Sequence, residues 1–116
     1  MKLYSLIILN YNTDIVYQSY DLSSFSFFKR NTIKEFIIFF AKTIAKRTNI
    51  NEKTSVEEEQ YFIHLYKTNN LTAIVVCDNE YPERSAFNII HKMLVETNSD
   101  DDNTSNEDTN SIGEQK

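Results

Sequence analysis

The chain has 116 residues and a formal net charge of −5, with 41% hydrophobic and 13% aromatic residues. Residues 1–96 carry eleven basic and eleven acidic side chains, so the net charge lies in residues 97–116, and a neutral body excludes charge-driven binding of nucleic acid or anionic membranes. The length fits one small domain, and a single cysteine, Cys77, excludes a disulfide framework and favours a reducing, cytoplasmic compartment.

The first half of the chain predicts a hairpin followed by a helix. Residues 2–9 are apolar on both faces, which is typical of a strand covered on both sides. A polar turn and a second strand at 15–20 complete a hairpin. Thr32 and Glu35 have the spacing of a capping box, so we expect a helix over residues 32–47.

The second half predicts three strands and another helix. Residues 53–57 form a short polar edge strand, and residues 60–67 and 71–78 form two strands joined by a tight turn. Pro82 suits the first turn of a helix that ends near Glu96. Apolar residues follow helical spacing in this segment: Ala86, Phe87, Ile90, Met93 and Leu94. This order predicts an antiparallel sheet with helices on its faces, an α+β domain.

Residues 97–116 have a different composition from the rest of the chain. They are acidic, rich in Asn, Asp and Ser, and almost free of bulky apolar side chains. Such a segment cannot offset the entropy of ordering by burial. We therefore predict a domain over residues 1–96 and a disordered tail over residues 97–116.

The residues that often carry chemistry do not form a recognisable site. His64 and His91 stand outside any metal-binding spacing, and Cys77 ends an apolar strand with no base implied nearby. The only glycine is Gly113, so no phosphate-binding glycine loop is present. Three consecutive carboxylates at 57–59 are typical of a solvated turn. The sequence predicts no cofactor, metal or catalytic residue.

The helix over residues 32–47 carries more apolar surface than one sheet face needs. On a wheel of about 100° per residue, one stripe faces the core: Ile33, Ile37, Phe40 and Ile44. Phe36 lies beside this stripe, Phe39 about 120° from Ile33, and Ile38 on the other flank. Two interpretations remain open: other segments cover these side chains, or they form an apolar groove for a partner.

The loop before this helix adds further aromatic residues, Phe25, Phe27 and Phe28. We expect all three rings to tuck under the helix as part of the core, because burial of aromatic rings stabilises a small domain strongly.

Three segments of the chain resemble a known family. Residues 1–6 (MKLYSL), 21–30 (DLSSFSFFKR) and 78–87 (DNEYPERSAF) resemble, in order and spacing, the N-terminal longin domains of R-SNAREs. The similarity points to the lipid-anchored branch without a transmembrane span, which is related to the synaptobrevins. It covers residues 1–96.

The resemblance implies a profilin-like fold and a regulatory function. Five antiparallel strands in the order 2-1-5-4-3 would lie between one helix and a helix pair. The domain would act in vesicle-mediated transport and membrane fusion, on ER–Golgi or endosomal routes. It would bind its own SNARE helix or lipid tail in a groove between the first helix and the third strand. The groove residues fall on Phe39, Phe36, Ile38 and Val56 of this sequence.

The chain also departs from the family pattern. It has no heptad segment with a central arginine, no C-terminal prenylation cysteine, and an acidic segment where the third helix belongs. Two interpretations remain open: the chain is part of a longer protein, or the acidic segment is an insertion that interrupts the domain. A longer parent protein would carry the SNARE segment and a lipid anchor, and would lie on the cytosolic face of Golgi, endosomal or vesicle membranes.

Two other functions remain open at this stage. One is a longin-type subunit of a trafficking adaptor or tethering complex, which suits the length of the chain. The other is an acyltransferase-like activity, which has been suggested for the family. The sequence offers no nucleophile–base pair for acyl transfer, so we expect a binding module and not an enzyme.

Overall fold

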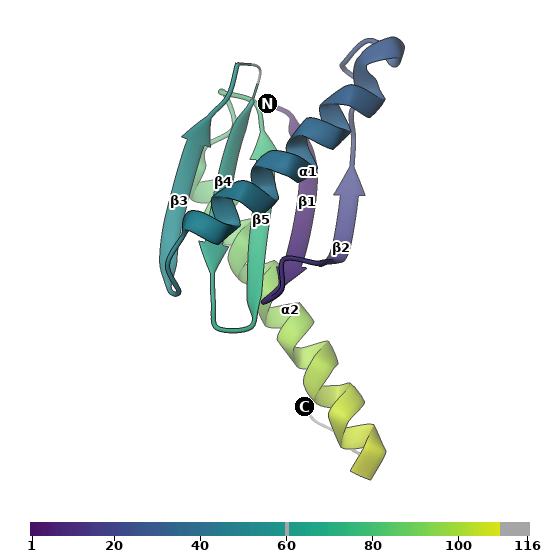
Figure 1. The fold of residues 1–116 in the computed structure, drawn as a ribbon, viewed down its shortest axis with the longest axis vertical. Coiled ribbons are helices and arrows are strands. Elements are labelled where there is room, and N and C mark those ends of the chain that lie inside the picture. The colour runs from purple at the N-terminus through teal and green to yellow at the C-terminus, as the bar shows by residue number, and fades with distance from the viewer. Residues whose placement is uncertain (60, 110–116) are drawn as a thin grey trace.

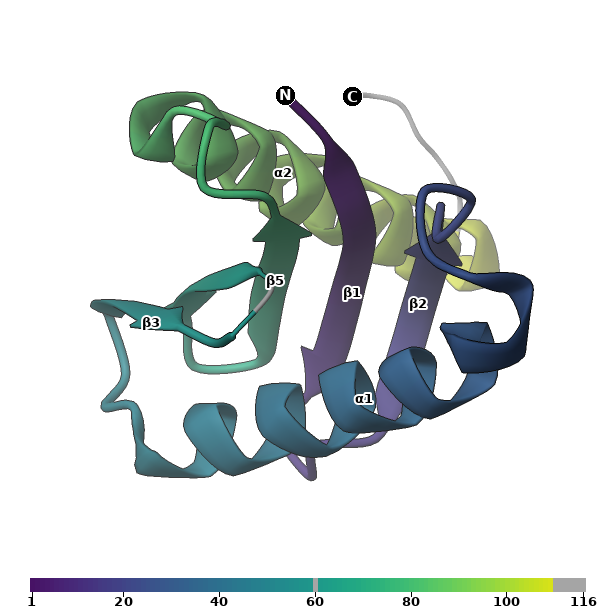
Figure 2. The same cartoon turned by 90° about the horizontal axis from the view of Figure 1, so that it is seen from above.

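The computed structural model describes residues 1–59 and 61–109, with side chains as far as residue 97. One antiparallel sheet lies between two helices, which cover its opposite faces (Figure 1 and Figure 2). In chain order the elements are β1 (Leu3–Asn10), β2 (Ile15–Tyr20), the 3-10 turn η1 (Phe27–Lys29), α1 (Arg30–Arg47), β3 (Glu52–Glu57), β4 (Phe62–Lys67), β5 (Leu71–Cys77) and α2 (Glu83–Thr109). The predicted α+β fold is confirmed.

The sheet has the order β2-β1-β5-β4-β3, as the resemblance implied. The central strands β1 and β5 are covered by helices on both faces, and β5 is buried at every position. This explains their continuous apolar sequences, because a strand with two covered faces has no solvent-facing side. The edge strands β2 and β3 are mostly exposed.

Helix α1 packs on one face of the sheet through residues spaced four apart. Its buried side chains are Ile33, Ile37, Ala41 and Ala45. Residues four apart lie on one side of a helix, and two alanines allow close approach to the strands beneath. The expected stripe is therefore rotated: Phe40 and Ile44 are only partly buried at its edge.

Helix α2 covers the other face with Ala86, Ile90 and Leu94, again spaced four apart. The prediction that this helix ends near Glu96 is wrong, because α2 continues to Thr109. An α-helix satisfies its backbone hydrogen bonds internally, so the polar composition after residue 96 does not by itself end it. Residues 110–116 lie outside the described part of the chain, and the division into domain and tail stays a prediction.

The start of α1 also differs from the prediction. The helix begins at Arg30 with Lys29 at its N-cap, and no side chain caps it. The proposed capping box is wrong because η1 leads directly into α1, so Thr32 already lies inside the first turn.

The loop aromatics before α1 divide into one partly buried ring and two exposed rings. Phe25 packs on Tyr4 with ring centroids 4.9 Å apart. Phe27 and Phe28 are 73% and 90% exposed, so the prediction that they join the core is wrong. Arg30 contacts two of these residues: its Nε donates to the Phe25 carbonyl oxygen at 3.1 Å, and its guanidinium lies over the Phe27 ring.

Candidate functional site

An apolar groove runs between α1 and the edge strand β3. It consists of two adjoining hollows of about 460 Å³ each, which share Phe40 and Glu58. The first is lined by Phe28, Lys29, Thr32, Ile33, Phe36, Phe40, Glu58, Glu59 and Tyr61. The second is lined by Phe39, Phe40, Thr43, Ile44, Arg47, Thr48, Thr54, Val56 and Glu58. We call these two hollows together the α1–β3 groove.

Three phenylalanines of α1 form one wall of the α1–β3 groove. Phe40 lies between the other two, with its ring centroid 6.2 Å from Phe36 and 5.5 Å from Phe39. Phe36 is 52% and Phe39 is 62% exposed, although each is large and apolar. A cluster of exposed aromatic rings beside a hollow is typical of a surface that binds a partner.

Hydrogen bonds at the C-terminal end of α1 fix the width of the groove. The Thr48 hydroxyl donates to the Ile44 carbonyl oxygen at 2.8 Å and lies 3.0 Å from the Thr54 hydroxyl of β3. Because the proton of Thr48 is used toward α1, the Thr54 hydroxyl donates to Thr48. Lys67 Nζ also donates to the Ala45 carbonyl oxygen at 2.9 Å, which ties α1 to β4. These contacts hold the C-terminal end of α1 against β3 and β4, so the second hollow is preformed.

The structure places three of the four predicted groove residues at this site. Phe39 and Val56 line the second hollow and Phe36 lines the first. Ile38 lines neither hollow, because it lies on the opposite flank of α1.

Sequence reasoning missed two residues that matter for the groove. Phe40 was assigned to the core, and Glu58 was assigned to a solvated turn. For Phe40 the sequence did hold a signal. Ile37, Ala41 and Ala45 are spaced four residues apart, and a buried stripe that follows this spacing leaves Phe40 at its margin.

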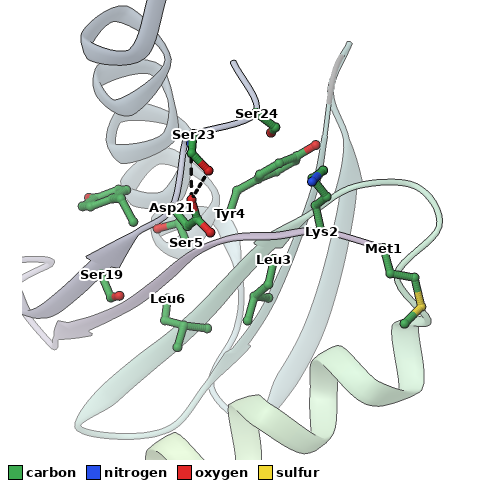
Figure 3. A pocket seen from close by; sticks show the side chains of 11 residues that line it. Met1, Lys2, Leu3, Tyr4, Ser5, Leu6, Ser19, Asp21, Ser23 and Ser24 are labelled. Atoms are coloured by element: carbon green, nitrogen blue, oxygen red, sulfur yellow. Dashed lines mark hydrogen bonds between the residues drawn. The ribbon is translucent and has the colours of Figure 1, made fainter. Parts of the chain in front are cut away.

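Apart from the α1–β3 groove, a polar hollow of about 410 Å³ lies where β1 extends beyond the end of β2. Figure 3 shows Tyr4, Asp21 and Ser23 on one side of β1 and Leu3 on the other. The Ser23 hydroxyl donates to the Asp21 carboxylate at 2.7 Å, as does the Ser23 amide at 3.2 Å, and these bonds lower the pKa of Asp21. The carboxylate is thus occupied by its own loop.

The histidine and cysteine of the sheet are structural. His64 is 3% exposed, with its Nδ1 2.8 Å from the Ser55 hydroxyl and its ring against Phe87 of α2. Burial lowers the pKa of His64, so the ring is neutral and serves packing. Cys77 is fully buried, and burial followed by the nearby Asp78 charge raises its pKa to about 11. A thiol in this environment is inert.

The residues that the structure describes offer neither a cluster of metal ligands nor a helix that could span a membrane. Among them, no three His, Cys, Asp or Glu side chains gather in a way that could hold a metal ion. Within the same residues, no helix combines the length and the apolarity needed to cross a bilayer.

The chain is similar to proteins that are named as synaptobrevin homologs and to a VAMP-like protein. Synaptobrevin homolog ykt6 of Schizosaccharomyces pombe is 42% identical over 100 residues, which cover 83% of this chain and 51% of the relative. VAMP-like protein YKT61 of Arabidopsis thaliana is 36% identical over 101 residues, which cover 83% of this chain and 51% of the relative. Synaptobrevin homolog YKT6 of Debaryomyces hansenii is 42% identical over 77 residues, covering 66% and 38%. The chain thus spans about half the length, or less, of these relatives.

A family model also matches most of the chain. It is described as Longin, a regulated-SNARE-like domain, and it matches residues 22–115. This range includes α1, β3 and therefore the whole α1–β3 groove. The chain belongs to the longin family, as a longin domain of the synaptobrevin-like R-SNARE type.

Proposed function

We propose that this domain regulates a SNARE protein in vesicle-mediated transport by holding an apolar segment in the α1–β3 groove. The names of its relatives, a synaptobrevin homolog and a VAMP-like protein, support a SNARE function. The segment is the SNARE helix of a longer parent protein or of a partner SNARE. An acyl or prenyl chain is the other class of occupant. Occupation of the groove keeps the protein closed and cytosolic, and release permits membrane fusion on ER–Golgi or endosomal routes.

The observation that carries the proposal is the exposure of Phe39 at the mouth of a preformed apolar hollow. Phe39 is 62% exposed and borders Phe40, Ile44 and Val56 across the second hollow. Complete burial of one such side chain is worth about 1.5–3 kcal/mol. Covering the two exposed rings of this wall, Phe36 and Phe39, therefore supplies enough free energy for reversible binding and not for permanent closure.

A pair of matched substitutions tests this proposal. Phe39→Glu places a charge in the second hollow, whereas Phe27→Glu places the same charge on a ring that is 73% exposed and lines neither hollow. Calorimetric titration with a designed amphipathic helical peptide and with dodecanoate gives the affinity for both occupant classes. Circular dichroism checks that both variants are folded.

The expected result is loss of binding by Phe39→Glu, at least about tenfold, and wild-type binding by Phe27→Glu. Equal binding by the wild type and Phe39→Glu would overturn the proposal. An unfolded Phe39→Glu variant would also contradict it, because the proposal requires that Phe39 contributes little to the core.

A further inference from the structure

The α1–β3 groove carries charged residues around its apolar floor. Glu58 and Glu59 lie on the wall formed by the β3–β4 turn, and Glu58 borders both hollows. Lys29 and Arg47 lie on the α1 wall, at the two ends of the groove. Among the described residues, no salt bridge joins any two of these four side chains. Their charges are thus available to an occupant.

The structure of the β3–β4 turn directs Glu58 toward α1. Thr54, Val56 and Glu58 alternate onto the side that lines the second hollow. Ser55 faces the opposite side, where its hydroxyl contacts His64 beneath α2. The Glu58 amide donates to the Tyr61 carbonyl oxygen at 2.8 Å, which holds the backbone of Glu58 next to the end of β3.

Resting on the proposed function, we infer that the groove selects an amphipathic peptide helix that presents lysine or arginine to Glu58 and Glu59, in preference to an acyl chain. An acyl chain would lie against two carboxylates, desolvate them in part and offer no counter-charge. A helix can place its apolar face on Phe39 and Phe40 while one flank carries cations to the opposite wall. Glu58 and Glu59 are then specificity-determining residues of the groove.

The length of the groove also suits a helix. It extends from Lys29, at the start of α1, to Arg47 and Thr48 at its end. Helix α1 has 18 residues, which corresponds to about 27 Å at 1.5 Å per residue. A helical peptide of about 18 residues that lies along α1 therefore matches both hollows.

The test uses two peptides of about 18 residues with one apolar face in common. The first carries lysines on the flank that faces the β3–β4 turn, and the second carries glutamates at the same positions. The variant Glu58→Gln/Glu59→Gln removes both groove carboxylates. The control variant Glu57→Gln/Glu35→Gln removes the same total charge at exposed positions that line neither hollow. Calorimetric titrations at low and high salt give the affinities.

We expect the wild type and the control variant to bind the lysine peptide about three- to tenfold more tightly than the glutamate peptide, with the difference reduced by salt. Glu58→Gln/Glu59→Gln should bind both peptides equally. The inference fails if that variant keeps the preference, if the control variant loses it, or if dodecanoate displaces both peptides at lower concentration. In each of these cases a loss of binding by Phe39→Glu leaves the proposed function intact. If Phe39→Glu binds both peptides normally, the proposed function itself fails.

Discussion

Two alanine substitutions on α1 separate the core of the domain from the groove. Ile37 is fully buried between α1 and the sheet, whereas Phe39 is 62% exposed two residues later. Truncation of a fully buried isoleucine to alanine costs about 2–5 kcal/mol, because it removes contacts and leaves a cavity. Phe39 has the larger side chain, but only about a third of it is covered, so Phe39→Ala should cost less than about 1 kcal/mol.

Both substitutions introduce alanine into the same helix, so the gain in helix propensity is small and similar in each. Urea unfolding followed by circular dichroism gives both changes in free energy of unfolding. Thermal unfolding should show a drop of about 10 °C or more for Ile37→Ala, given about 4–8 °C per kcal/mol for a domain of this size. Equal destabilisation by the two variants would refute the reasoning, because Phe39 would then be a core residue.

Three further predictions concern the sheet. Lys67→Met removes the donor to the Ala45 carbonyl oxygen, so it should lower the free energy of unfolding by about 1 kcal/mol in urea titrations; no change would mean that the bond is dispensable. Burial lowers the pKa of His64 below its ordinary 6.5. The unfolded chain then takes up the proton first, so stability is complete above pH 6.5 and falls as the pH drops through the folded-state pKa. His64→Gln should flatten this pH dependence in urea titrations, and an unchanged slope would contradict it. Cys77, with a pKa of about 11, should resist a thiol reagent until the chain is denatured, and rapid labelling of the folded domain would show that it is accessible.

The sheet could be predicted from the sequence to within one or two residues at most strand ends. The reason is that β1 and β5 are covered on both faces and read as continuous apolar runs, which few other structures produce. The strand order came from the resemblance and not from the residues, because periodicity alone does not state which strands pair.

The errors arose where local patterns competed with tertiary structure. The capping-box spacing of Thr32 and Glu35 was a coincidence, since η1 already sets the start of α1 two residues earlier. Apolarity predicts burial of Phe27 and Phe28, but of the three loop rings only Phe25 packs against the core.

The groove was predictable in part. The angular position of Phe39 on the helix indicated an exposed ring, and the structure has it exposed. Ile38 was grouped with Phe39 although it lies on the other flank. The contribution of Glu58 depends on how the β3–β4 turn faces α1, which is a contact between segments distant in sequence and leaves no local signal.

The most direct test of the central claim is a map of amide chemical-shift changes by NMR while the amphipathic lysine peptide is titrated into the domain. If the peptide binds in the α1–β3 groove, the largest changes in amide chemical shift should occur at residues that line it: Phe36, Phe39, Phe40, Thr54 and Val56. Residues of α2 and of the edge strand β2 should change little, because they lie on other surfaces. Shifts concentrated on α2 or β2, with the groove residues unmoved, would contradict the assignment of the binding surface.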